Sequence, residues 1–194
     1  MAAGSKPLRV DAARNRDKLL AAATQAFAEH GLDAPLEPIA RAAGVSIGTL
    51  YAHFPTREAL YDAILPAQLA ALDAIATQAW AEPDPWVGFV RFVEGLFSTQ
   101  AKDHGLNDAL ARRLPLSPAV LDACRLGFQH AERILTRAKA AGELRLDFEP
   151  SDLAALATAM SQLIHESIST TPDAWRRHLA FFLDGLRASA ARAR

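Results

Sequence analysis

His104 and Asp108 lie four residues apart, a spacing that places two potential metal ligands on the same face of a helix. One such pair is only a weak sign of a metal site. The sequence contains no glycine-rich phosphate loop and no His-Glu-x-x-His segment, and its single cysteine, Cys124, cannot form a paired-cysteine site. We therefore expect no catalytic residues, no metal and no cofactor, and keep a helical enzyme as the alternative.

The segment from Ser46 to Phe54 has residues suited to a different chemistry, the recognition of duplex DNA. Leu50 and Phe54 form an apolar pair at i and i+4, which faces inward if this segment is helical. The outer face and its shoulders then carry mostly small or polar residues, namely Ile47, Gly48, Thr49, Tyr51, Ala52 and His53. A helix that enters the major groove needs such a face, because bulky side chains hold it away from the base edges. Ser46 can cap this helix, whose free N–H groups also favour a phosphate.

Two short helices joined by a tight turn are needed to present this face. The apolar periodicity predicts helices over residues 36–43 and 46–54, with Gly44 between them. The small residues that let these helices pack at a steep angle are Ala40, Ala43 and Gly44. A preceding helix is expected to end at Gly31, and Thr56 is expected to cap a long helix that follows.

Five short motifs follow one another here with a fixed spacing: Ile39-Ala40, Ala43-Gly44-Val45-Ser46, Gly48-Thr49-Leu50-Tyr51, His53-Phe54 and Arg57-Glu58-Ala59-Leu60. In these motifs the chain resembles the tetracycline-repressor (TetR) family of bacterial regulators from about Asn15 to Leu65. The resemblance implies a regulator that binds double-stranded operator DNA, most simply a repressor released by an unidentified small-molecule effector. Because helix-turn-helix repressors bind two half-sites, we expect a homodimer. A helical adaptor without DNA binding is the other alternative.

The resemblance also implies roles for single positions. Bases would be approached by Ile47, Gly48 and Thr49, phosphates would be held by Tyr51, His53 and Arg57, and the same surface includes Arg41, Ser46 and Thr56. The chain departs from the family's pattern at Pro35-Leu36, where many relatives have a capping Thr or Ser. The recognition helix also lacks Arg, Asn and Gln, so we expect methyl contacts, water and DNA shape to contribute to discrimination. Alternatively, these polar residues only solvate a surface helix.

The rest of the chain is also expected to be helical. Hydrophobic residues make up 51% of the sequence, with Ala and Leu the most abundant, which favours helix over strand. Helix start signals at Asp84-Pro85, Ser117-Pro118, Ser151 and Thr171-Pro172 bring the expected total to about nine helices. The segment from Glu143 to Glu149 alternates like a short strand, but its length and its Gly and Pro boundaries favour a loop.

We predict three parts in an all-α chain: a flexible arm over 1–13, a helix-turn-helix DNA-binding domain over 14–60 with its motif at about 35–54, and a helical ligand-binding and dimerisation domain over 61–194. Up to Arg57 the chain has seven basic and five acidic residues, a mild excess that is compatible with DNA binding. The single cysteine and the charged N-terminal segment indicate a cytoplasmic protein. No apolar run was expected to reach the roughly 18 to 20 residues of a membrane span, so no membrane partner is predicted.

Two apolar stripes near the C-terminus predict the dimer interface. They supply Leu156, Leu163, Leu179, Phe182, Leu183 and Leu186, which fit a four-helix bundle across a twofold axis. The alternative is that both stripes belong to the core of a single chain.

A ligand pocket is expected inside the bundle, lined by aromatic residues with a few polar ones. The candidates are Trp86, Phe89, Phe92, His104, Cys124, Phe128, Gln162 and His165. Each could instead be an ordinary core or surface residue. In the expected mechanism, ligand binding favours a dimer conformation in which the spacing of the two helix-turn-helix domains no longer matches the operator.

Overall fold

The computed structural model describes residues 5–111, 118–167 and 169–191, and these residues form helices joined by short turns. In chain order they are α1 (Ser5–His30), α2 (Leu36–Ala42), α3 (Ile47–His53), α4 (Arg57–Ala81), α5 (Pro85–Lys102), α6 (His104–Ala111), α7 (Pro118–Ala140), α8 (Pro150–Ser167), α9 (Ala174–Leu186) and a 3-10 turn (Ala188–Ala190). The prediction of an all-helical fold with about nine helices is therefore confirmed within the described ranges.

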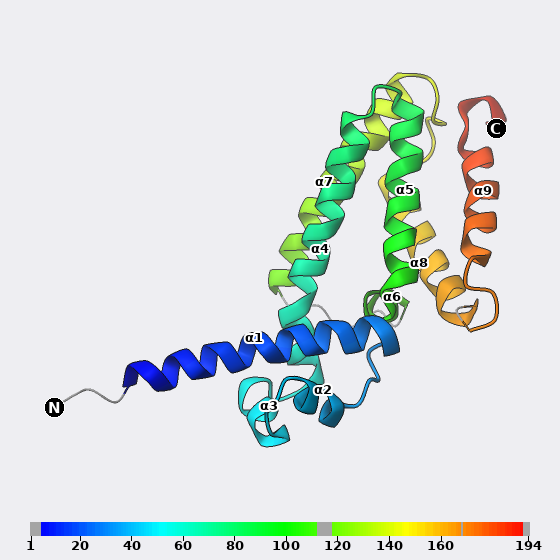
Figure 1. Ribbon diagram of the computed structural model, residues 1–194. Coiled ribbons are helices and arrows are strands. Elements are labelled where there is room, and N and C mark those ends of the chain that lie inside the picture. The colour runs from blue at the N-terminus through cyan, green and yellow to red at the C-terminus, as the bar shows by residue number, and fades with distance from the viewer. Residues whose placement is uncertain (1–4, 112–117, 168, 192–194) are drawn as a thin grey trace.

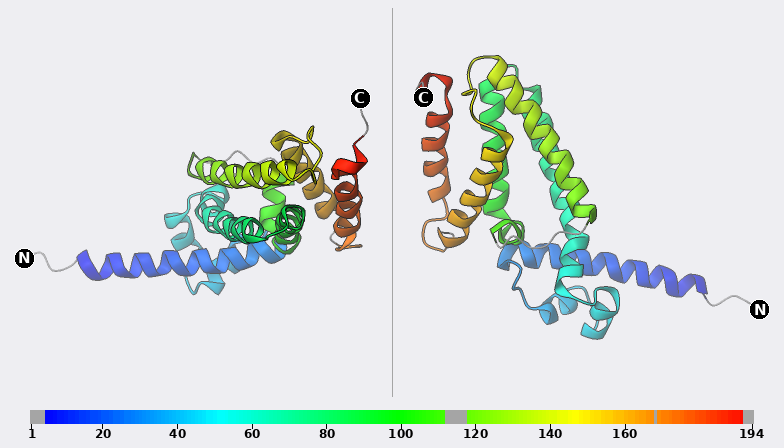
Figure 2. Two further views of the ribbon diagram at one scale, coloured as in Figure 1. Left: turned by 90° about the horizontal axis from the view of Figure 1, so that it is seen from above. Right: turned by 180° about the vertical axis from the view of Figure 1, so that it is seen from behind.

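The N-terminal helices form the foot of a taller helical body (Figure 1). α1 lies across the bottom of this body, α2 and α3 lie below α1, and α4 rises from them beside α5 and α7. Figure 2 shows from two further directions that the start of α1 projects beyond the body on one side, while α9 covers the opposite side.

The first turns of α1 differ from the prediction of a flexible arm over 1–13. α1 begins at Ser5, so residues 5–13 are helical. Pro7 lies in the first helical turn, where its missing N–H removes no hydrogen bond. After it, no glycine or proline interrupts the sequence before Gly31, which ends α1 with a φ of 72° as expected.

The buried apolar side chains form two clusters. The first, here called the N-terminal core, joins α1, α2, α3 and the start of α4, and includes Leu19, Phe27 and Leu50, none of which is solvent-exposed. The second, the C-terminal core, joins the end of α4 with α5, α7, α8 and α9. α6 lies at the base of the body, against α1 and α8, and its Leu106 and Ala109 are buried in the N-terminal core. α6 therefore connects the foot of the molecule to the body.

Three predicted helix caps are present. The side-chain oxygens of Ser46, Thr56 and Asp84 accept backbone N–H groups from Thr49 (3.1 Å), Ala59 (3.1 Å) and Trp86 (2.8 Å), respectively. Each cap satisfies a donor that has no partner inside its own helix, so these residues fix where α3, α4 and α5 begin.

The starts of the last helices differ from the prediction. α8 begins at Pro150, one residue before the predicted cap Ser151, and Asp152 accepts the N–H of Glu149 at 2.8 Å instead. α9 begins only at Ala174, without a side-chain cap. Ser117, the predicted cap of α7, lies outside the described residues.

The segment 143–149 is a loop, as predicted. Its alternating pattern arises because Leu144 and Phe148 are buried in the C-terminal core, whereas Leu146 is 76% exposed. Its only regular pairing among the described residues is an isolated bridge between Leu144 and Arg187. The alternation therefore anchors a loop and does not build a sheet.

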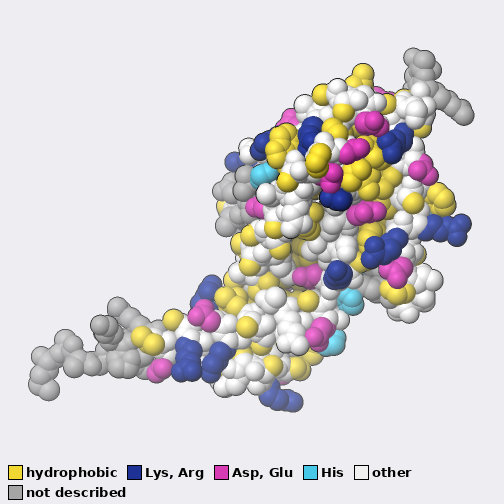
Figure 3. Space-filling view, turned by 45° about the horizontal axis from the view of Figure 1, so that its top comes forward, with side chains coloured by type: hydrophobic (Ala, Val, Ile, Leu, Met, Phe, Trp, Pro, Cys, Tyr) yellow, Lys and Arg dark blue, Asp and Glu magenta, His cyan; other side chains and the backbone are white. Residues whose placement is uncertain are grey.

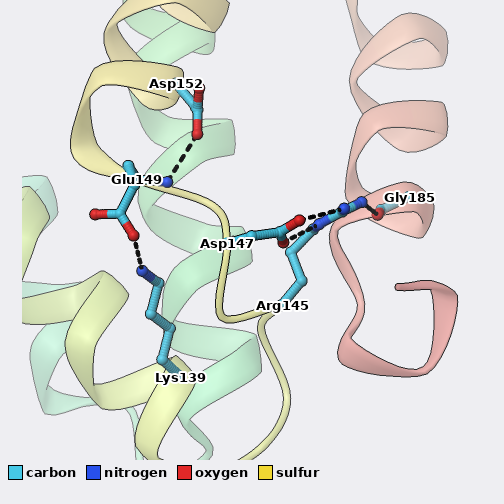
Figure 4. Close-up of polar contacts among 6 residues, drawn as sticks. All are labelled: Lys139, Arg145, Asp147, Glu149, Asp152 and Gly185. Atoms are coloured by element: carbon cyan, nitrogen blue, oxygen red, sulfur yellow. Dashed lines mark hydrogen bonds and ion pairs between the residues drawn. The ribbon is translucent and has the colours of Figure 1, made fainter. Parts of the chain in front are cut away.

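Polar contacts hold this loop in place (Figure 4). Arg145 makes a two-point ion pair with Asp147, with distances of 2.6 and 2.8 Å, and this pairing raises the pKa of Arg145. A third nitrogen of Arg145 donates to the carbonyl oxygen of Gly185 at 3.2 Å, which ties the loop to α9. Lys139 on α7 pairs with Glu149 at 3.0 Å at the other end of the loop.

One helix differs from the expectation about apolar runs. α4 is long and apolar enough, by length and composition, to cross a membrane. The core helix of a globular protein meets the same criterion, and α4 packs along α5 and α7 with side chains in both cores.

Candidate nucleic-acid interface and internal cavities

The outer face of α3 is small and solvent-accessible. Leu50 and Phe54, 0% and 3% exposed, anchor the helix in the N-terminal core, as expected from their spacing. Gly48 and Ala52 are exposed, and Tyr51 is 48% exposed at the edge of this face. Ile47, Thr49 and His53 are half-buried. The helix can therefore approach another surface closely along its glycine and alanine positions.

The N-terminus of α3 is fixed by a local pair of hydroxyl groups. Ser46 Oγ accepts the N–H of Thr49 at 3.1 Å and lies 2.9 Å from Thr49 Oγ1. The two hydroxyls therefore satisfy each other in the free protein. A base or phosphate contact through either one must share or replace this hydrogen bond.

Arg57 occupies a different position from the one expected for a phosphate-binding residue. Its Nη1 donates to the backbone carbonyl oxygen of Leu32 at 2.6 Å and also to that of Ala34. The guanidinium is thus turned toward the turn between α1 and α2. The main role that this geometry supports for Arg57 is to hold α4 against that turn.

The N-terminus of α4 already carries its own anion. Thr56 caps this helix, and Glu58 lies fully exposed in its first turn. The backbone N–H of Glu58, and then the Thr56 hydroxyl, hydrogen-bond its carboxylate and lower its pKa. A DNA phosphate at this site would compete with the Glu58 carboxylate, which argues against a phosphate contact through Thr56, one of the residues assigned to the DNA-binding surface.

Arg16 is a basic residue near α3 that the motif comparison did not single out. Its guanidinium carbon lies 5.3 Å from the ring centroid of Phe54, so α1 places a positive charge beside the end of α3. The side chain is exposed, as is Arg41 on α2. Figure 3 shows Lys and Arg side chains gathered on the part of α1 that projects beyond the body. The sequence alone gave no sign of this proximity, which depends on how α1 crosses α3.

A polar cavity of about 190 Å³ lies where α1, α6 and α8 meet. Its lining residues are His30, Gly31, Asp33, His104, Asn107, Asp108 and His165. Asp108 is 6% exposed and is placed between two elements, because one oxygen accepts the N–H of Leu32 at 3.1 Å and the other lies 2.8 Å from His165 Nδ1. Among the described residues, no group of three or more His, Cys, Asp or Glu side chains could hold a metal ion.

A second, mostly apolar cavity of about 280 Å³ lies between α4, α5, α7 and α8 and is partly open to solvent. Its lining side chains include Leu69 and Leu72 on α4, Leu96 and Gln100 on α5, and Leu106 on α6. Gln100 is 0% exposed, and neither its Nε2 nor its Oε1 has a hydrogen-bond partner among the described residues. Burying such a group without a partner typically costs about 1–3 kcal/mol, so its position requires an explanation.

The predicted pocket residues fall into four groups in the structure. Phe92 and Phe128 line the apolar cavity, whereas His104 and His165 line the polar one. Trp86 and Phe89 pack in the C-terminal core away from both, and Gln162 is exposed. The side chain of Cys124 lies outside the described part of the chain. Sequence reasoning missed Gln100, because a glutamine in an apolar helix gives no signal of its burial.

The residues predicted for the dimer interface fall into a buried group and a more exposed group. Leu156, Leu179, Leu183 and Leu186 are at most 9% exposed within the single chain, which agrees with the alternative of an intramolecular core. Leu163 is half-buried, and Phe182 is 47% exposed. The neighbouring Phe181, which was not predicted, is 61% exposed. Phe181 and Phe182 are therefore the large apolar side chains that α9 leaves exposed.

Two sequence-family models match this chain. The model for bacterial regulatory proteins of the tetR family matches residues 19–64, and the model for the C-terminal domain of SbtR-like transcriptional regulators matches residues 84–188. None of the curated proteins compared with the chain matches it.

Solved structures agree with these matches. A TetR transcription regulatory protein from Mycobacterium vanbaalenii is 33% identical with a TM-score of 0.59, over 93% of this chain and 99% of that one. The TetR transcriptional regulator SCO0520 from Streptomyces coelicolor is 34% identical with a TM-score of 0.58, over 89% and 98%. The fatty acid degradation regulator FadR from Bacillus halodurans, 21% identical with a TM-score of 0.63 over 88% and 99%, shares the fold.

The helix-turn-helix geometry of α2 and α3, the all-helical body and both family matches agree along most of the chain. The protein therefore belongs to the TetR family of DNA-binding transcriptional regulators.

Proposed function

We propose that this regulator is an effector-responsive homodimeric repressor, which binds a palindromic operator through α3 and leaves it when a small molecule occupies the apolar cavity. In this proposal residues of about 14–60 read the DNA, and residues 61–194 sense the effector and dimerise. The observation that carries the DNA-binding part is the face of α3, where Gly48 and Ala52 are exposed and Leu50 and Phe54 hold the helix from behind.

We assign the DNA contacts by position on this surface. Ile47, Gly48 and Thr49 approach base edges, while Tyr51, His53 and Arg16 provide donors to phosphates from the edges of the interface. Arg41 and Ser46 are available at its margin, since both side chains are exposed. Thr56 and Arg57 contribute mainly by fixing the start of α4, because their polar groups already have partners within the chain.

The apolar cavity is placed so that its occupant can affect the reading head. Leu106 lines the cavity and is at the same time buried in the N-terminal core. Leu69 on α4 also lines the cavity and packs against that core. A ligand that displaces these two side chains therefore acts on the packing beneath α1 and α3. RolR, a protein of the same fold at 18% identity, has been solved in complex with resorcinol.

Two hydrogen bonds make α6 a direct connection between the cavity and the foot. The Tyr61 hydroxyl donates to the carbonyl oxygen of Gly105 at 3.1 Å, and burial raises the pKa of this hydroxyl, so it remains a neutral donor. Asp108 on the same helix accepts the N–H of Leu32. A small shift of α6 would thus move both α4 and the turn before α2, which changes the spacing of two reading heads in a dimer.

Phe181 and Phe182 on α9 support dimerisation. Two adjacent phenylalanines with 61% and 47% exposure form an apolar surface of the kind that marks a protein interface. We propose that they contact the partner chain across a twofold axis, and that Leu163 extends this contact on α8. The buried leucines of α8 and α9 then support the interface from within the chain.

Selection of bound duplexes from random DNA tests the proposed DNA-binding surface around α3. A palindromic sequence is expected, with affinity that falls steeply as salt rises. Tyr51→Phe, His53→Ala and Arg16→Ala should each weaken binding to all sequences, whereas Thr49→Ala should alter which sequence is preferred. His130→Ala, on α7 and away from this surface, is the control. If the three phosphate variants bind like the unchanged protein, the placement of the interface is wrong.

The proposed release of DNA by an effector is tested on the protein–operator complex. Addition of small molecules that bind the cavity should release the DNA, and Ala154→Phe, which fills the cavity wall on α8, should prevent release without weakening DNA binding. Failure of every cavity-binding molecule to change operator affinity would contradict effector-controlled repression.

A further inference from the structure

Gln100 on α5 is the one glutamine among the described residues that line the apolar cavity. Gln100 follows Phe92 and Leu96 at intervals of four along α5, so all three side chains face the cavity from one side of the helix. Both amide atoms of Gln100 are buried without a hydrogen-bond partner among the described residues. In a lining that is mostly apolar, Gln100 therefore contributes an amide NH2 group that can donate and an oxygen that can accept hydrogen bonds.

The other polar side chains of the lining do not satisfy this amide. Thr158 on α8 donates its hydroxyl to the carbonyl oxygen of Ala154 at 3.1 Å. Asp73 on α4 is half-buried, and neither residue forms a hydrogen bond with Gln100. A molecule inside the cavity, or water, is the partner that remains for the amide.

The charges of the lining exclude an anionic head group. The described lining residues include no Lys, Arg or His, and the one charged side chain among them is the carboxylate of Asp73. An anion placed beside Gln100 would lose its hydration without gaining a counter-charge. An uncharged head that both donates and accepts hydrogen bonds matches Gln100 without this loss.

We infer that the effector is a neutral, largely apolar small molecule with one hydrogen-bonding head, such as an amide or a hydroxyl group, and that Gln100 is the residue that recognises this head. This inference depends on the proposed effector site, and adds to it the ligand class and the discriminating residue. The volume of about 280 Å³ is slightly below the roughly 300–1,000 Å³ typical of small-molecule sites, which favours a compact ligand.

Two probes with the same tail test the head group. Octanamide and octanoate are titrated calorimetrically into the full-length protein at neutral pH. We expect octanamide to bind at least about tenfold more tightly than octanoate, since only the anion loses hydration without a counter-charge. Equal binding, tighter binding of octanoate, or no binding of either probe would overturn the inference.

Gln100→Met tests whether the Gln100 amide recognises the head group, because methionine has a similar shape without the amide. This variant should bind octanamide about tenfold more weakly than the unchanged protein, which is the usual scale for one buried hydrogen-bonding group. Gln78→Met, at an exposed position of α4, is the matched control and should leave both affinities unchanged. Retention of full octanamide affinity by Gln100→Met would contradict the assigned role.

Thermal unfolding without a probe provides a second readout that does not depend on binding. Since Gln100→Met removes two buried polar atoms that have no partner among the described residues, its unfolding temperature should equal or exceed that of the unchanged protein. A clear decrease would show that the amide already has a structural partner and would overturn the inference.

These outcomes are distinguishable from failure of the proposed function. If octanamide binds through Gln100 but no cavity ligand releases the operator, the ligand class stands and effector control of DNA binding fails. If an anionic molecule releases the operator and Gln100→Met responds to it normally, the proposed function stands and the inference about the ligand class fails.

Discussion

Asp108 and His165 lie 2.8 Å apart, between Asp108 Oδ1 and His165 Nδ1, and this contact joins α6 to α8 at the base of the helical body. The second oxygen of Asp108 accepts the N–H of Leu32. One buried carboxylate thus connects α6 and α8 with the turn that precedes α2. His165 contributes the more exposed half of this arrangement, with a side chain that is 45% exposed.

Replacing Asp108 should destabilise the protein more than replacing His165. Asp108→Ala leaves the buried N–H of Leu32 without its acceptor, which typically costs about 1–3 kcal/mol of unfolding free energy. His165→Ala removes a partly solvated partner and should cost less, on the order of 1 kcal/mol or below. Chemical denaturation measures both, with Asp173→Ala as the control, because Asp173 precedes α9 and forms an exposed ion pair with Arg176. A larger effect for His165 would contradict the role given to Leu32.

Gly31 should tolerate alanine less well than Gly142. Both glycines have a φ of 72°, so either substitution incurs the left-handed penalty of roughly 1–2 kcal/mol. A Cβ at Gly31 would also lie 2.5 Å from Asp108 Oδ2, whereas nothing lies within 4 Å of a Cβ at Gly142. Gly31→Ala should therefore lose more unfolding free energy than Gly142→Ala. Equal losses in urea denaturation would mean that the carboxylate moves aside at no cost.

Arg57→Ala should act mainly on stability. Its loss leaves the carbonyl oxygens of Leu32 and Ala34 without their charged donor, and hydrogen bonds to charged groups contribute about 1.5–3 kcal/mol. Arg41→Ala, at an exposed position, should leave the unfolding temperature nearly unchanged. The salt dependence of DNA binding decides between the two roles of Arg57. A slope that falls by about one for Arg57→Ala, at unchanged stability, would show a phosphate contact instead.

The stability contribution of Glu58 should depend on pH. Its folded-state pKa is below the ordinary value of 4.5, because the ionised form accepts hydrogen bonds at the start of α4. The stability difference between the unchanged protein and Glu58→Gln should therefore be fully present above pH 4.5, and should be lost as pH falls through the lower folded pKa. Thermal unfolding across this range measures it. A difference that grows on acidification would show that the carboxylate is not held in its ionised form.

Local features were predictable because they depend on residues close together in the chain. The helix ends at Gly31, Ser46 and Thr56 follow from backbone geometry and from side chains within three residues. The inward pair Leu50 and Phe54 follows from helical spacing. For the same reason, the motifs around this pair were enough to indicate the family.

The placement of side chains from distant segments could not be predicted in this way. Spacing on a helix shows which residues share a face. It does not show whether that face is covered by another helix of the same chain or by a second chain. For this reason Leu179 and Leu183 were assigned to an interface, although the single chain buries them. Arg57 was expected to face DNA, yet a turn 23 to 25 residues earlier provides the carbonyl oxygens that hold it.

The sequence by itself determined the helical class, the helix-turn-helix face and the helix ends, because each depends on interactions between neighbours in the chain. Only the tertiary structure decided that Asp108 accepts the N–H of Leu32, and that Gln100 lines an apolar cavity with no hydrogen-bond partner for its amide in the described parts of the chain. Such contacts depend on how whole helices cross, and the crossing is set by the combined packing of two cores and not by any single residue or motif.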